Sequence, residues 1–320
     1  RINGKDASIG VSLEIERYPQ HGESADEILH NADSAMYQSK DPGHRGFALF
    51  RRADDAQVQA RNRLSAELRQ AISRQELELY YQPQVDVRSG VVTAAEALLR
   101  WRHPEHGLLL PGTFIPLAEE NGMILDIGSW VLEEACRTLA AWRSRGLAPG
   151  RVSINVAPRQ FCHGPFARDV HRQLTNRGLP PESLELEITE SVLAAPGAAG
   201  HQALGQLASL GVRLVIDDFG TGYAGVGLLK GLPVHGMKVD RTFVHDVPDR
   251  AEAVAGAEAI VALAGALGKD LIVEGVETRE QLAFFRQRDC RVFQGYLFSE
   301  PLSRRDFETA AVASERFAVA

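Results

Sequence analysis

Strand-like and helical segments alternate along most of this chain, and this alternation restricts the folds that it can adopt. Apolar runs typical of strands lie at 77–86, 91–101, 152–156, 184–189, 212–217, 237–239, 271–274 and 292–296. Segments typical of helices lie at 113–121, 128–145, 166–176, 201–210, 251–267 and 279–288. Alternation repeated this often predicts an α/β fold, a β/α barrel rather than two dinucleotide-binding halves. No G-x-G-x-x-G motif follows a strand, which weakens the dinucleotide alternative further.

The barrel is expected to occupy residues 75–310, with a hairpin at its start. A tight turn at Arg88-Ser89-Gly90 joins the first two strands, so these strands are expected to run antiparallel. Before the barrel, residues 1–50 combine one helix and two short strands, an α+β segment too small to bury a core of its own. Residues 51–74 predict a charged helix that links this segment to the barrel, and residues 311–320 are a C-terminal tail.

Composition limits the partners and the compartment of the chain. The net charge of −7 over 320 residues argues against a nucleic-acid polymer as partner but leaves a small nucleotide ligand open. Cys136, Cys162 and Cys290 are odd in number and lack a C-x-x-C pair, which indicates a reducing, cytoplasmic compartment. No apolar run reaches the ~20 residues that cross a bilayer, so no membrane span is expected in this segment. The chain begins with Arg1 rather than Met, which is consistent with part of a larger, membrane-anchored sensor.

Two adjacent carboxylates, Asp217 and Asp218, follow the apolar run 214–216 and precede the turn Gly220-Thr221-Gly222. Because a buried charge is costly unless it is paired or bound to a metal, these acids require a partner. One reading is a pair of helix N-cap residues, since Asp is common at that position. The other reading is a pair of ligands at the end of a buried strand, and the rest of the chain decides between them.

Similar polar residues occur at the ends of most other predicted strands, where barrel enzymes build their active sites. The set is Glu96, Asn155, Glu187, Asp217, Asp218, Lys238, Glu274, Glu277 and Gln294. Taken singly, each has an ordinary explanation, such as an outward-facing Glu187 or helix capping by Glu277. Lys238 could likewise form a surface pair with Asp240. Repetition at matching strand ends favours one shared site, whose oxygen ligands suit two Mg²⁺ or Mn²⁺ ions and phosphodiester hydrolysis.

The N-terminal segment carries a first family resemblance, in residues 8–11 and 32–40 together with Gly43 and Phe50. These residues resemble the C-terminal part of a GGDEF domain, which in active members is a diguanylate cyclase. The Gly-Gly-Asp/Glu-Glu-Phe turn that carries the cyclase chemistry is missing from the sequence. The resemblance therefore implies a partial domain without cyclase activity.

The barrel segment carries a second resemblance, in motifs at 81–83, 95–101, 114–119, 155, 160–161, 187–190, 217–223, 238–240, 274–277 and 294–296. In this order, over about residues 64–305, they resemble the EAL-domain phosphodiesterases, whose signature stands here as Glu96-Ala97-Leu98. The resemblance implies a modified (β/α)8, TIM-like barrel with one antiparallel strand. It also implies a homodimer that hydrolyses cyclic di-GMP to linear pGpG with two Mg²⁺ or Mn²⁺ ions, in bacterial second-messenger signalling. Ca²⁺ is expected to inhibit, because its larger and looser shell disturbs a bridged pair of ions.

The resemblance also assigns roles to individual residues. The metal ligands would be Glu96, Asn155, Glu187, Asp217, Asp218 and Glu274, with Asp217 as the bridge. The catalytic group would be Lys238 beside the attacking water, Glu96 and Glu277. The substrate contacts would be Gln82, Leu98, Arg100, Asp240 and Gln294, and the forked guanidinium of Arg100 suits a phosphate. A regulatory loop that couples dimer contact to the site would contain Phe219, Gly220, Thr221 and Gly222 and would be held by Glu190.

Four residues, Ala157, Ala224, Val273 and Glu300, depart from those common in the family, and none of them removes a metal ligand. A non-catalytic cyclic di-GMP receptor, which would keep the pocket and signal by binding, is the main alternative. Such receptors typically lose metal ligands, whereas this sequence keeps all of them, which favours the enzyme. A scaffold that acts through its dimer surface is a further alternative.

Overall fold

The computed structural model describes residues 13–15, 47–49, 52–147, 149–161, 165–190, 192, 198–220 and 231–312. The chain forms two compact units, Arg1–Gln70 and Ala71–Ala320. In the first unit, β1 (Leu13–Ile15) pairs in parallel with β2 (Phe47–Leu49), and α2 (Arg52–Ala71) is the helix predicted for 51–74. The GGDEF-like residues at 8–11 and 32–40, with Gly43 and Phe50, lie outside the described residues, so that resemblance stays a prediction.

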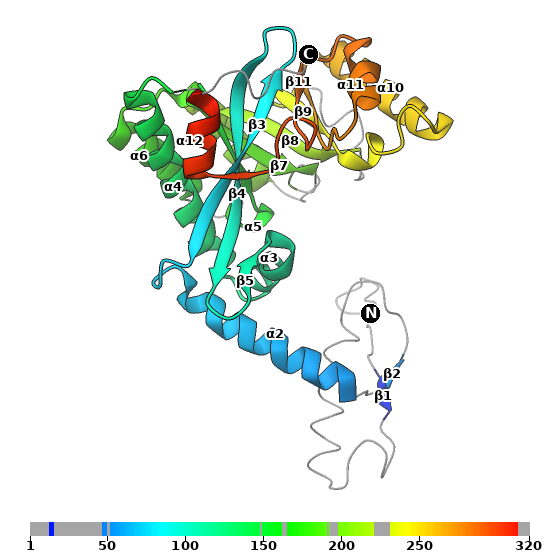
Figure 1. The fold of residues 1–320 in the computed structure, drawn as a ribbon. Coiled ribbons are helices and arrows are strands. Elements are labelled where there is room, and N and C mark those ends of the chain that lie inside the picture. The colour runs from blue at the N-terminus through cyan, green and yellow to red at the C-terminus, as the bar shows by residue number, and fades with distance from the viewer. Residues whose placement is uncertain are drawn as a thin grey trace, which may run out of the picture. The chain divides into compact units, whose positions relative to one another are not determined.

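Eight strands in the described part of the second unit close into a barrel, which confirms the predicted fold (Figure 1). They are β3 (Leu77–Asp86), β4 (Val91–His103), β6 (Val152–Val156), β7 (Leu184–Thr189), β8 (Arg213–Phe219), β9 (Gly236–Val239), β10 (Asp270–Val273) and β11 (Val292–Phe293). Neighbours follow the order β3-β11-β10-β9-β8-β7-β6-β4, and pairing of β4 with β3 closes the ring. β3 runs antiparallel to both of its neighbours, whereas the other neighbouring strands run parallel.

The β3–β4 hairpin begins the barrel, as the Gly90 turn predicts. Gly90 has φ +70°, a left-handed conformation that glycine adopts without strain, and the Asp86 carboxylate accepts hydrogen bonds from the backbone N–H groups of Arg88 and Ser89. The end of this hairpin that lies away from the Gly90 turn extends past the barrel (Figure 1). There β5 (Gly107–Leu109) pairs antiparallel with β4, and α3 (Pro111–Glu120) follows it. Because β5 has only three residues, it leaves no periodic pattern in the sequence.

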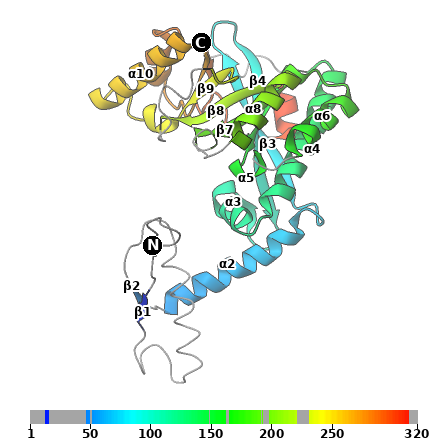
Figure 2. The ribbon, with the colours of Figure 1, turned by 180° about the vertical axis from the view of Figure 1, so that it is seen from behind.

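Helices cover the outside of the barrel, as Figures 1 and 2 show from opposite sides. They are α4 (Ile124–Ser144), α6 (Phe166–Arg177), α8 (Ala198–Leu210), α10 (Ala251–Leu267), α11 (Arg279–Arg286) and α12 (Arg304–Val312), with the short α5 (Pro158–Phe161) and the 3-10 turns η1 (Pro181–Ser183) and η2 (Arg241–Phe243). Strands enclosed on both faces are rich in apolar residues, and Leu214, Val215 and Ile216 of β8 are fully buried. None of the described helices has both the length and the apolar character that crossing a bilayer requires.

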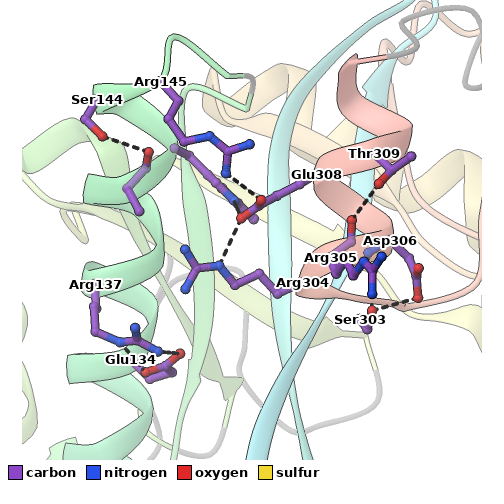
Figure 3. A network of polar contacts seen from close by, with 12 residues as sticks. Glu134, Arg137, Ser144, Arg145, Ser303, Arg304, Arg305, Asp306, Glu308 and Thr309 are labelled. Atoms are coloured by element: carbon purple, nitrogen blue, oxygen red, sulfur yellow. Dashed lines mark hydrogen bonds and ion pairs between the residues drawn. The ribbon is translucent and has the colours of Figure 1, made fainter.

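A C-terminal strand and helix pack against β3, the first strand of the barrel, and against α4, and the sequence patterns did not predict them. β12 (Leu302–Ser303) pairs antiparallel with β3, and the ring of Phe307 on α12 stacks on Trp142 of α4 at 5.0 Å. The Glu308 carboxylate lies between the side chains of Arg145 and Arg304, as Figure 3 shows. It accepts a third hydrogen bond, from the indole of Trp142 at 2.9 Å. With nine residues and a charged first turn, α12 is too short for a strong helical period.

Candidate active site

The ammonium group of Lys238 lies at the centre of the polar cluster at one end of the barrel. Lys238 belongs to β9, and it is only 1% exposed. Its Nζ lies 2.6 Å from Glu187, 2.6 Å from Glu274, 3.2 Å from Asp217 and 3.4 Å from Glu96. These acids come from β7, the end of β10, β8 and β4, so the predicted convergence of strand-end residues on one point is present.

Strand register brings these side chains into neighbouring positions. Glu96 on β4 lies opposite Gln82 on β3, and Asn155 on β6 lies opposite Glu187 on β7. The same parallel pairing places Thr189 of β7 beside Asp217 of β8. Because parallel strands carry their carboxyl ends to the same end of a barrel, acids far apart in sequence meet there.

A bulge in β8 explains how two consecutive acids serve one site. Successive residues of a regular strand point to opposite faces, but the pairing of β8 with β9 shifts register between Ile216 and Phe219. Within this shift Asp218 has φ +53°, an uncommon left-handed conformation for a residue other than glycine. Asp217 faces Lys238 while Asp218 lines the adjoining cavity. The pair ends a strand, and the helix N-cap reading is wrong.

Amide side chains hold Glu96 in place. One carboxylate oxygen accepts a hydrogen bond from Asn155 Nδ2 at 2.8 Å, and the other accepts one from Gln294 Nε2 at 2.5 Å. Gln294 Nε2 also donates to Gln82 Oε1 at 2.9 Å, while its own Oε1 accepts from Gln84 Nε2 at 3.0 Å. Gln84 was not among the predicted site residues, and its contact fixes which end of the Gln294 amide faces Glu96.

Electrostatics shows that the site carries more negative than positive charge. Burial disfavours a charged Lys238, yet the surrounding acids, led by Asp217 and Glu187, raise its pKa well above the ordinary value. Burial, with the charge of Glu96, raises the pKa of Glu187 well above its usual range. Burial also raises the pKa of Glu274 to about 8. Four carboxylates thus share one ammonium group, and some of them resist ionisation.

The pKa values of Asp218 and Glu96 are shifted in opposite directions. Burial and the charge of Asp217 raise the pKa of Asp218 to about 6, and a hydrogen bond with Asp240 contributes. Burial opposes the charge of Glu96, but Lys238 and the hydrogen bonds from Gln294 and Asn155 outweigh it and lower the pKa. The surroundings of Glu96 therefore favour its ionised form, unlike those of Glu187 and Glu274.

The donor set fits hard divalent cations. Among the described residues, no three Asp, Glu, His or Cys side chains stand in an arrangement that could hold a metal ion as they are. The acids of the cluster instead point to the ammonium group of Lys238. Glu187 Oε1 is nevertheless buried without a hydrogen bond. Carboxylate and amide oxygens are the ligands that suit Mg²⁺ and Mn²⁺, and the excess of carboxylates over cations and the buried unpartnered oxygen are consistent with a bound cation.

A cavity of about 270 Å³ opens beside this cluster. Its walls include Gln82, Leu98, Asp218, Asp240, Glu277 and Gln294 from the predicted site, together with Arg241 and Tyr296. Arg100 is not among the lining residues, because its Nη1 donates to the backbone oxygen of Leu99 and its guanidinium lies over the Tyr80 ring. Arg241 and Tyr296 were not predicted as site residues, although Tyr296 follows the Gln294-Gly295 motif and is 61% exposed.

Comparison with known proteins identifies the family. The EAL domain model matches residues 65–301. The chain belongs to the EAL-domain family. It is 40% identical over 302 residues to the bifunctional diguanylate cyclase/cyclic di-GMP phosphodiesterase MucR of Pseudomonas aeruginosa, covering 94% of this chain and 44% of that protein. It is 43% identical over 296 residues to the cyclic di-GMP phosphodiesterase NbdA of the same species, covering 92% and 37%.

Solved structures agree with this assignment. A structure described as the PaMucR phosphodiesterase in complex with c-di-GMP superposes with a TM-score of 0.74 and 41% identity, covering 77% of this chain and 99% of that chain. The chain spans less than half the length of the curated relatives MucR and NbdA. The match of the EAL domain ends before α12 begins, so the C-terminal helix lies outside the matched residues.

The predicted regulatory loop of this EAL domain is described only in part. Glu190 is buried, and its Oε2 has no hydrogen-bond partner. Phe219 ends β8, and Gly220 has φ +100°, with the Phe243 ring only 2.8 Å from where a Cβ would stand. Thr221 and Gly222 lie outside the described residues. A side chain at position 220 would therefore meet both backbone strain and a ring.

The start of α11 tests the expectation that Glu277 caps a helix, and it shows a role for Gln281 that was not predicted. Thr278, not Glu277, caps α11, because the Thr278 hydroxyl accepts from the backbone N–H of Gln281. Glu277 instead lines the cavity, and its backbone N–H donates to the Gln281 side chain. Nothing in the sequence marked this contact, because Gln281 lies within a predicted helix and belongs to no motif.

Proposed function

We propose that this EAL domain hydrolyses cyclic di-GMP to linear pGpG with two Mg²⁺ or Mn²⁺ ions. The observation that carries the proposal is the convergence of four carboxylates, from Glu96, Glu187, Asp217 and Glu274, on Lys238 beside a cavity. The names of MucR and NbdA support this choice of substrate, as does the complex of the MucR domain with c-di-GMP.

The acids at the strand ends would hold the ions. Glu96, Asn155, Glu187 and Asp217 would bind one ion, with Asp217 bridging to a second that Asp218 and Glu274 complete. When bound, such ions polarise the phosphoryl group and make water a nucleophile at neutral pH. The amides of Asn155 and Gln294 would keep the Glu96 carboxylate ionised and oriented.

Lys238 would act with its proton in place. Without bound ions the surrounding acids raise its pKa, which favours the charged ammonium form. It is suited to orient the attacking water and to stabilise negative charge that develops on the phosphate. Glu277 on the cavity wall would support this group.

The rest of the cavity would bind the dinucleotide. Gln82, Leu98 and Asp240 would contact a guanine and the flank of the ligand, and the exposed ring of Tyr296 offers a face on which a base can stack. Arg100 would leave its position over Tyr80 to grip a phosphate. We propose further that the domain works as a homodimer within a larger cytoplasmic or membrane-anchored signalling protein, and that residues 1–50 are the C-terminal part of a GGDEF domain.

The direct test is to incubate the purified chain with cyclic di-GMP and Mg²⁺ or Mn²⁺ and to follow products by chromatography. One equivalent of pGpG per substrate is expected, because one water opens one phosphodiester bond. Binding without any product over hours in Mn²⁺ would contradict the proposal and favour the receptor alternative.

The metal requirement has its own readout. Mn²⁺ at about a hundred times its Kd is expected to stabilise the fold by about 2.7 kcal/mol in thermal unfolding, since it binds the folded chain. Ca²⁺ is expected to stabilise the fold without supporting hydrolysis, because its looser shell does not keep a bridged geometry. Hydrolysis in Ca²⁺ at the rate seen in Mg²⁺ would overturn this part.

A further inference from the structure

We propose that Gln281 is a positioning residue that fixes the loop carrying Glu274 and Glu277 against the segment that follows Lys238. The inference rests on the proposed function for its catalytic consequence. The contacts of Gln281 with the loop can be tested whether or not the proposed function is correct. Gln281 belongs to none of the predicted site residues and touches neither the cavity nor the acids around Lys238.

The Gln281 side chain is 4% exposed and every polar atom on it is used. Its Oε1 accepts hydrogen bonds from the backbone N–H groups of Glu277, at 2.8 Å, and Thr278, at 3.0 Å. Its Nε2 donates to the backbone oxygen of His245 at 3.2 Å. One amide group therefore joins the loop after β10, which supplies Glu274 and Glu277 to the site, to the segment after η2, and Asp240 lies at the other end of η2.

The opposite side of the same loop is clamped by close backbone approaches. A Cβ at Gly295 would stand 2.1 Å from the Val276 oxygen, so only glycine permits this contact beside Gln294. The backbone N–H of Val276 donates to the Gln294 oxygen at 3.2 Å. Gly275 has φ +64°, and a Cβ there would stand 2.6 Å from the Arg241 Cβ. Close backbone packing and one backbone hydrogen bond thus fix residues 275 and 276 of the loop. The side-chain amide of Gln281 fixes residues 277 and 278 through hydrogen bonds.

Helix capping alone does not account for these contacts. A capping box needs a bond from the N-cap N–H to the side chain three residues on, and Thr278 with Gln281 meets that requirement. The bonds to Glu277, which precedes the cap, and to His245, in another segment, lie outside any capping motif. Supporting groups of this kind typically change metal affinity or activity by about 10–100-fold when they are removed.

The test compares Gln281→Leu with Gln281→Glu and Thr278→Ala. Gln281→Leu removes the acceptor and the donor, Gln281→Glu keeps the acceptor and loses the donor, and Thr278→Ala weakens the helix cap alone. Residue-resolved hydrogen exchange is expected to speed up at least about tenfold at the Glu277 and Thr278 amides in Gln281→Leu. Gln281→Glu is expected to keep both amides protected, and Thr278→Ala is expected to keep the Glu277 amide protected.

Activity and metal binding give the functional half of the test. In Gln281→Leu, kcat is expected to fall about 10–100-fold and Mn²⁺ binding to weaken by a similar factor, while KM changes little. Thr278→Ala is expected to lower thermal stability with near wild-type kcat. If both variants lose kcat in proportion to stability, Gln281 is a structural cap and the inference is wrong.

The two proposals fail in different ways. If the wild-type chain releases no pGpG, the proposed function fails, while hydrogen exchange at Glu277 and Thr278 still decides whether Gln281 holds the loop. If Gln281→Leu does not fold, the exchange pattern of Gln281→Glu decides instead. Unprotected Glu277 and Thr278 amides in that variant would overturn the inference, because its carboxylate retains the acceptor.

Discussion

Glu185 and Glu187 lie two residues apart on β7, so their side chains share a face of the strand, and both are 1% exposed. Glu185, near the amino end of the strand, accepts a hydrogen bond from Arg213 at 3.0 Å and has Arg151 at 3.6 Å. Glu187, at the other end, shares the single ammonium of Lys238 with three more acids. The same residue type is thus neutralised at one end of the barrel and left in excess at the other.

The difference separates stability from function within one strand. Arg213 also pairs with Asp270 at 2.7 Å, so arginines and acids alternate at the amino end, where a cavity of about 440 Å³ lies. Burial disfavours the charge of Arg213, but its bonds to Asp270 and Glu185 raise its pKa. Acids and arginines offset each other's charge at this end, although Glu185 Oε1 and Arg151 Nε are buried without a hydrogen bond. At the other end the excess of acids is relieved by protonation, as the raised pKa values of Glu187 and Glu274 indicate, or by added positive charge such as that of a bound cation.

The largest expected effect lies at the unbalanced end. Glu187→Gln is expected to lower cyclic di-GMP turnover at least about a thousandfold, about 4 kcal/mol of barrier. The thermal unfolding midpoint is expected to hold or rise, because one of several mutually repelling acids becomes neutral. Turnover in Mn²⁺ and scanning calorimetry measure the two quantities. A variant that loses stability and activity together would remove the distinction between the two ends.

Glu185→Gln should give the reverse pattern. Leaving Arg213 and Arg151 without a buried carboxylate is expected to cost about 3 kcal/mol of unfolding free energy, or roughly 6–12 °C in Tm, with kcat unchanged. Asp270→Asn is the matched control, since Asp270 is 69% exposed and its pair with Arg213 is worth at most about 1 kcal/mol. Urea titrations compare the three proteins, and an equal loss in both variants would contradict the assignment.

The smallest expected effect concerns an acid that has cationic partners of its own, Glu308 on α12, whose carboxylate lies between Arg145 and Arg304 (Figure 3). Burial opposes its charge, but hydrogen bonds from Arg145, Arg304 and Trp142 lower its pKa to about 2. A lowered folded-state pKa stabilises the fold above the ordinary value near 4.5, and this contribution is lost as the pH falls toward 2.

Glu308→Gln is therefore expected to lower the unfolding free energy by about 1–2 kcal/mol at pH 7. The gap from wild type should narrow steadily below pH 4.5, as urea unfolding at pH 7, 4.5 and 3 would show. Asp306→Asn, on the same helix but bonded to Ser303, is the control and should show no such gap. A gap independent of pH would mean that packing on Trp142, rather than charge, holds α12.

The sequence predicted the barrel and most of the cluster because both follow from short-range patterns. Strand ends in an alternating α/β chain gather at one end, and the contacts of Lys238 with Glu187, Asp217 and Glu274 agree with this. Glu96 reaches the same cluster from the middle of β4, because that strand extends past the barrel. The Gly90 turn correctly gave the antiparallel hairpin. Ion binding at this site was inferred from its oxygen ligands, and the assignment of individual ligands from the family resemblance; both stay predictions.

Long-range packing supplied what the patterns missed. Gln84 and Gln281 act through amide contacts with residues 210 and 36 positions away, and nothing in their local sequence marks them. α12 is short and charged, and it is held by Trp142 and Arg145 from α4. Arg241 reaches the cavity wall because Gly275 lets the two segments approach, a fact of backbone geometry.

The bulge at Asp218 has a consequence for how such motifs are interpreted. A regular strand offers an interior position at every second residue, so two neighbouring acids can serve one site only while the irregularity persists. A substitution in β9 that removed this register shift would turn the Asp218 side chain outward, although the Asp217-Asp218 sequence would stay the same. Two homologues with the same motif could then differ in the number of ligands they present, and the residue to compare would lie on the neighbouring strand.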